Sequence, residues 1–99
     1  MDAITHSLAR YVLSLSQASE GTHCAEDRPL YRMYLAEAGI LLALAAMGVE
    51  RDLLRRRMAQ HERLWGQTWL QDPVCRGPSL AWQEVQRAFM TDQTGQGAS

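Results

Sequence analysis

Three residues of this sequence have types and spacing that could support chemistry: a glutamate, Glu37, an arginine, Arg57, and a histidine, His61. Glu37 stands among bulky apolar residues, where a carboxylate is costly to bury unless it is paired. Gly48 lies between the acid and the two cationic residues, at a position suited to the end of a helix. If the flanking helices form an antiparallel hairpin about Gly48, the three side chains reach a similar depth. We therefore predict a buried or half-buried polar cluster of Glu37, Arg57 and His61.

Such a cluster can serve three purposes. It can be a salt bridge that fixes helix register or dimer geometry, a catalytic acid–base pair, or part of a surface that recognises a partner. The sequence favours the salt bridge, because no nucleophile or oxyanion donor is expected to converge on the pair. We accordingly expect a protein without enzymatic activity and without a bound cofactor.

Candidate recognition residues follow in the segment 50–70. Five arginines and three acidic residues between positions 50 and 63 leave a net charge of about +2, which is typical of a solvated helix face. Arginine and tryptophan are also the residues that most often anchor protein–protein interfaces. The candidate partner-binding residues are therefore Arg55, Arg56, Arg63, Trp65 and Trp69.

Residues 43–55 resemble a helix-turn-helix, with Gly48 at the turn and residues 51–57 on the recognition helix. The sequence departs from that motif at Leu44, four residues before the glycine, where the motif has a small residue. The resemblance implies a nucleic-acid-binding regulator as the alternative function. A net charge of -1 over the whole chain gives that alternative no electrostatic support.

The question of metal or disulfide chemistry is raised by two cysteines, Cys24 and Cys75, and for zinc also by His23 and His61. In an up-and-down bundle both cysteines lie in loops at the same end, so a disulfide or a zinc site is conceivable. The sequence has no CxxC spacing, however, and an intracellular compartment keeps thiols reduced. We expect free thiols and no bound metal.

The spacing of apolar residues predicts an all-α fold, a small four-helix bundle with helices over about residues 3–18, 28–47, 50–70 and 79–90. Residues 28–47 are apolar nearly all round, so this helix is expected in the middle of the bundle. Residues 91–99 contain nothing to bury and are predicted to form a disordered tail. The domain organisation is thus one helical domain, 1–90, followed by the tail, 91–99.

The composition indicates the kind of organism and the cellular compartment from which the protein comes. Lysine and asparagine are absent, and isoleucine occurs only at Ile4 and Ile40, which indicates a GC-rich and hence bacterial genome. The N-terminal residues lack the pattern of a signal peptide, and the apolar stretch 38–49 is shorter than the roughly 20 residues that span a bilayer. We expect a cytoplasmic protein with no membrane contact.

These features favour a small bacterial protein-interaction module that binds another protein, as an adaptor, chaperone, inhibitor or regulatory subunit. Its gene could belong to a mobile element or a phage. Because three neighbours in a 99-residue chain cannot cover an all-round apolar helix, we also expect a homodimer. The interface would use helix 28–47 or the tryptophan-bearing part of helix 50–70. An enzyme built around Glu37 and His61 is the third reading of the sequence.

Overall fold

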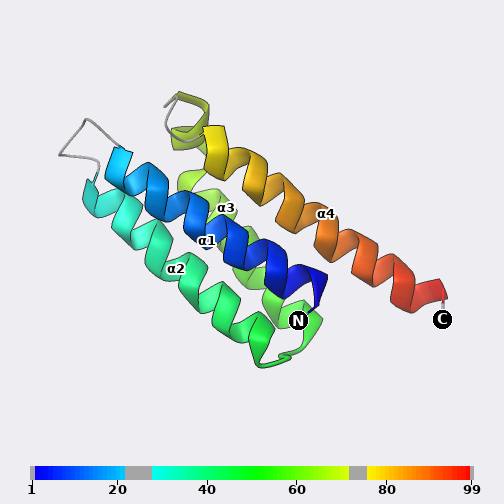
Figure 1. The fold of residues 1–99 in the computed structure, drawn as a ribbon. Helices are drawn as coiled ribbons and strands as arrows, with labels where there is room; N and C mark the ends of the chain where they lie inside the picture. The colour runs from blue at the N-terminus through cyan, green and yellow to red at the C-terminus, as the bar shows by residue number, and fades with distance from the viewer. Residues whose placement is uncertain (1, 22–27, 72–75, 99) are drawn as a thin grey trace.

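The computed structural model describes residues 2–21, 28–71 and 76–98, and it gives the backbone alone for residues 21, 28, 30, 65–71 and 92–98. Four α-helices run up and down: α1 (Ala3–Gly21), α2 (Arg28–Ala46), α3 (Arg51–Gln71) and α4 (Arg76–Ala98) (Figure 1). This part of the chain contains no β-strand, which confirms the predicted all-α bundle. Within the same residues, no helix is long and apolar enough to cross a membrane.

A Schellman motif ends α2 and sets the direction of α3. Gly48 has a φ of +72°, a left-handed conformation that costs glycine little because it has no Cβ. The Val49 amide donates to the Leu44 carbonyl at 3.3 Å, and the Gly48 amide donates to the Ala45 carbonyl at 3.1 Å. Val49 and Leu44 both pack against the core, so the turn is anchored as well as bent. The chain therefore reverses here, and α3 runs back along α2 (Figure 1).

The middle of the bundle is occupied by α1 rather than by α2. Leu8, Tyr11 and Leu15 of α1 are fully buried. α1 packs closely against both α2 and α4, whereas the closest neighbours of α2 are α1 and α3. The expectation that helix 28–47 lies in the middle is therefore wrong. An apolar composition all round a helix does not determine how many helices cover it.

One face of α2 and of the turn after it is open to solvent although its residues are apolar. Met33 is 42% exposed, Ile40 is 46% exposed and Met47 is 75% exposed. The small residues Ala36 and Ala43, which could admit a second backbone, are exposed as well. The opposite face is buried and contributes to the core Tyr31, Tyr34, Ala38 and Leu41. The hairpin of α2 and α3 thus exposes apolar surface that nothing in the described chain covers.

α4 begins earlier along the chain than predicted. The helix begins at Arg76 rather than Ser79, because Pro78 fits the first turn, where its missing N–H costs no hydrogen bond. Pro78 is fully buried, and a Cβ on Gly77 would lie 3.2 Å from the Ser14 hydroxyl, so this turn packs on α1. At the other end α4 extends to Ala98 and projects beyond the other helices (Figure 1).

Candidate functional site

His61 lies on the inner side of α3 and is 1% exposed. The Tyr11 hydroxyl lies 2.5 Å from its Nε2, and Oε2 of Glu37 lies 3.2 Å from its Nδ1. Because a carboxylate only accepts hydrogen bonds, we assign the proton to Nδ1, which leaves Nε2 to accept from the Tyr11 O–H. Both ring nitrogens are then satisfied in the neutral imidazole. We call this set the Tyr11–His61–Glu37 triad.

Three aromatic rings enclose the imidazole. The ring centroids of Tyr11 and Tyr34 lie 5.6 Å and 6.3 Å from it, both edge-on, and that of Trp82 lies 5.2 Å away. Since these residues come from α1, α2 and α4, His61 is the point where all four helices meet. Burial lowers the pKa of His61, and the hydrogen bond and charge of Glu37 oppose this shift only in part. His61 is therefore neutral at pH 7.

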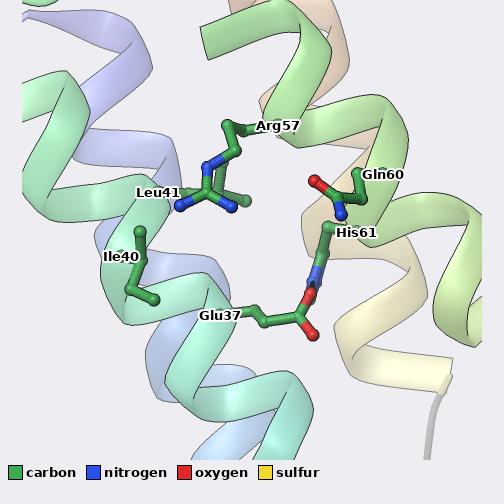
Figure 2. Close-up of a pocket in the computed structure, with 6 residues that line it drawn as sticks. All are labelled: Glu37, Ile40, Leu41, Arg57, Gln60 and His61. Atoms are coloured by element: carbon green, nitrogen blue, oxygen red, sulfur yellow. Dashed lines mark hydrogen bonds and ion pairs between the residues drawn. The ribbon is translucent and has the colours of Figure 1, made fainter. Parts of the chain in front are cut away.

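A pocket of about 150 Å³ lies beside Glu37, between α2 and α3 (Figure 2). The Glu37 side chain, 29% exposed, points across the groove to His61, while Arg57 extends from α3 toward α2. Arg57 is exposed, and it forms no ion pair with any residue that the structure describes. The structure thus brings the three predicted cluster residues to one pocket, but it bonds only Glu37 to His61. The complete lining is Glu37, Ile40, Leu41, Arg57, Gln60 and His61.

The chemistry available in this pocket is limited to polar contacts and proton exchange. The triad connects a phenol, an imidazole and a carboxylate, but the described lining contributes no hydroxyl or thiol nucleophile. Among the described residues, no three His, Cys, Asp or Glu side chains gather where they could hold a metal ion. The predicted alternative metal or disulfide residues His23, Cys24 and Cys75 lie outside the described residues. This geometry is best described as a structural polar cluster that contains one half-buried carboxylate, that of Glu37.

A second hollow, of about 680 Å³, is lined by residues of α3. It brings together three of the predicted partner-binding residues, Arg55, Arg56 and Arg63, whereas the side chains of Trp65 and Trp69 lie outside the described residues. Ala59, Gln60 and Leu64 complete its described lining. We call this feature the arginine hollow.

The charges of the arginine hollow are partly neutralised from within α3. Asp52 forms ion pairs with Arg55 and, at 2.6 Å, with Arg56. The hydrogen bonds from these two guanidinium groups lower the pKa of the Asp52 carboxyl. Arg63 has no ion pair with a described residue, so it is the cation of the hollow that is most available to a partner.

The remaining arginine of the segment, Arg51, has a different environment. Its guanidinium carbon lies 5.7 Å from the centre of the Phe89 ring, so Arg51 packs against α4 through a cation–π contact. It is half-buried, unlike the exposed arginines further along α3. Arg51 therefore belongs to the joint between α3 and α4 rather than to a recognition surface.

Sequence reasoning assigned Tyr11 and Trp82 to the core alone and Tyr34, with Tyr31, to a possible extension of the recognition surface. In the structure Tyr11, Tyr34 and Trp82 complete the environment of His61. The Tyr34 hydroxyl, in addition, donates to the Leu64 carbonyl at 3.1 Å and ties α2 to α3. One signal was present in the sequence: a tyrosine on an apolar helix face must find a hydrogen-bond partner for its hydroxyl. For Tyr11 and Trp82, which face α3 from α1 and α4, no spacing rule identifies that partner.

The chain was also compared with known proteins. It matches no protein-family model, no curated protein and no solved structure.

Proposed function

We propose that this chain is a protein-interaction module that binds another protein through the arginine hollow on α3. The observation that supports it is the hollow itself, whose lining combines three arginines with the apolar residues Ala59 and Leu64. Arginine beside apolar surface is the composition that anchors protein–protein contacts, because guanidinium groups pair with carboxylates in a fixed geometry while their stems cover apolar area. The module would act as an adaptor, chaperone, inhibitor or regulatory subunit.

The alternative is a nucleic-acid-binding regulator that uses the same arginines. Three observations favour protein instead. The Asp52 carboxylate already offsets part of the charge of Arg55 and Arg56. The whole chain carries a net charge of -1, which gives no long-range attraction for a polyanion. The contacts of Tyr34 with Leu64 and of Glu37 with His61 also hold α2 and α3 alongside each other, unlike the crossed helices of a helix-turn-helix.

A matched pair of charge reversals tests the proposal. Arg63→Glu changes an exposed arginine in the hollow, and Arg87→Glu changes an exposed arginine on α4, outside it. Each tagged protein is incubated with nuclease-treated bacterial lysate, and the bound material is quantified by mass spectrometry and by absorbance at 260 nm. We expect a stoichiometric protein that the wild type and Arg87→Glu retain and that Arg63→Glu loses.

Two results would contradict this proposal. If the wild type and both variants bind the same protein equally well, the binding surface does not include the arginine hollow. Nucleic acid that appears without a protein partner, and whose binding falls steeply with salt, would establish the alternative.

We also propose that the protein forms a homodimer through the exposed face of the α2–α3 hairpin. The exposed apolar side chains of Met33 and Ile40 support this, because exposed apolar patches on small proteins often mark interfaces. A bacterial cytoplasm is the proposed location, supported by the lack of lysine and asparagine and by the absence of any described helix suited to a membrane. Sedimentation velocity measures the oligomeric state directly.

A further inference from the structure

We infer that two copies of the chain pair through their α2–α3 hairpins about a two-fold axis running along the groove between these helices, so that Glu37 of each copy meets Arg57 of the other. This inference rests on the self-association proposed above and specifies its geometry. It assigns a purpose to two charged groups that share a pocket without pairing.

Two rows of side chains form the surface in question, which we call the hairpin face. Helical spacing places Met33, Glu37, Ile40 and Leu44 in one row along α2. The same spacing places Leu53, Arg57, Gln60 and Leu64 in one row along α3. Both rows look into the same groove, because Glu37, Ile40, Arg57 and Gln60 all line the pocket (Figure 2).

The hairpin face has apolar ends and a polar centre. The bonds from Tyr34 to Leu64 and from Glu37 to His61 fix the level of α2 against α3. Met33 therefore lies across the groove from Leu64, which is 48% exposed, and Leu44 lies across from Leu53, which is 42% exposed. Between these two apolar pairs, Glu37 faces Gln60.

A two-fold axis along the groove makes this face complementary to itself. The rotation keeps every residue at its own level and brings α2 of the second copy over α3 of the first, so the register needs no further choice. Met33 and Leu64 then meet Leu64 and Met33 of the second copy, and the Leu44–Leu53 end behaves in the same way. Apolar side chains cover apolar side chains at both ends.

Charge favours the same axis. Glu37 is bonded only to a neutral imidazole, and Arg57 has no ion pair with a described residue, so each copy brings one available negative and one available positive group. Glu37 of one copy lies at the level of Gln60 of the other, and Arg57 lies three residues, or about 4.5 Å, further along α3, a span that its long side chain covers. Across the axis these four groups therefore balance and form two intermolecular pairs. A two-fold axis perpendicular to the helices would instead lay α3 on α3 and oppose the arginines of the two copies, which costs free energy.

The area suffices for a dimer of moderate affinity. α2 has 19 residues, which at about 1.5 Å each span about 28 Å, and two helices side by side are about 20 Å wide. The hairpin face therefore covers a flat footprint of about 570 Å² per copy. A standard interface buries about 800 Å² of accessible surface per partner, which a corrugated face of this footprint approaches. We expect a dissociation constant in the micromolar range.

The test uses two charge reversals that complement each other. Arg57→Glu gives both central positions negative charge, and Glu37→Arg gives both positive charge, so each variant alone should be monomeric in sedimentation velocity over the micromolar range. Mixed in equal amounts, the two variants should form a heterodimer, because both intermolecular pairs are then restored. Each single reversal should raise the dissociation constant at least tenfold.

A second pair of variants removes the dependence on Glu37→Arg, which also loses the bond to His61. Leu64→Asp places a charge on the hairpin face, and Leu80→Asp places one at a site on α4 that is 58% exposed and outside that face. We expect Leu64→Asp to be monomeric and Leu80→Asp to dimerise as the wild type does. Circular dichroism checks that each variant is folded.

Each other outcome is decisive. A wild-type protein that stays monomeric at high micromolar concentration removes the self-association and this inference together. A wild-type dimer that Arg57→Glu and Leu64→Asp leave intact keeps the self-association but overturns the proposed axis. A mixture of folded Arg57→Glu and Glu37→Arg that stays monomeric overturns the charge pairing.

Discussion

Mild acidification should destabilise this protein through His61. Burial lowers the pKa of His61 below 6.5, the value that the unfolded chain regains. Between the folded and the unfolded pKa, the unfolded state therefore binds more protons than the folded state. The free energy of unfolding must then rise with pH across this window. The stability that the neutral imidazole provides is fully present above the unfolded pKa and is lost as the pH falls through 6.5 toward the folded pKa.

The size of the pH effect on stability is limited because only one proton is bound, at His61. A single site changes the free energy of unfolding by at most about 1.4 kcal/mol per pH unit within its window. The carboxyls of Asp2 and Asp52, whose pKa values are lowered from 3.8, act at more acidic pH and do not contribute here. Urea denaturation at a series of pH values between about 5 and 8 measures the slope directly.

Two histidine variants isolate the source of the slope. His61→Gln should abolish it, because no buried imidazole remains to titrate. His6→Gln, which removes an exposed histidine from α1, should leave it unchanged. The reasoning would be refuted by a wild-type stability that does not fall below pH 6.5, or by a slope that persists in His61→Gln.

Two further predictions concern individual contacts. Tyr11→Phe removes the hydroxyl that donates to His61 and leaves a buried ring nitrogen unsatisfied, so it should lower the free energy of unfolding by about 1–3 kcal/mol in urea titration; no loss would exclude the bond. Gly48→Ala should cost about 1–2 kcal/mol, because its φ of +72° strains a Cβ, whereas Gly39→Ala should stabilise by about 0.5–1 kcal/mol, because it lies inside α2 with nothing within 4 Å of its new Cβ. Thermal melts in which both glycine variants shift the melting temperature in the same direction would contradict this.

The meeting of Glu37 and His61 was predictable because one local feature determines it. Gly48 ends α2 in a left-handed turn, and the short connection that follows forces α3 back along α2. Once the hairpin is fixed, counting residues from the turn gives the level of each side chain. Arg57 followed the same rule and reached the same pocket, but its long side chain turns toward α2 without pairing with Glu37.

The contacts of His61 with Tyr11 and Trp82 were not predictable in this way. These three residues lie on α1, α3 and α4, and no short turn links α1 to α3. The prediction that α2 lies in the middle of the bundle was wrong for a related reason. Its apolar residues suggested a central helix, but burial depends on how many helices pack around it, and α1 has closer neighbours on both sides.

The way α3 is attached determines how the protein opens. Among the residues that the structure describes, the backbone of α3 packs most closely against α2. Its links to α1 and α4 depend on side chains, chiefly Tyr11 and Trp82 around His61 and the stacking of Arg51 on Phe89. α1 and α4, in contrast, pack closely along each other. The least costly partial unfolding therefore releases α3 from the bundle while α1, α2 and α4 keep their contacts. Amide hydrogens of α3 would exchange with solvent before those of α1, and protonation of His61 would widen the difference.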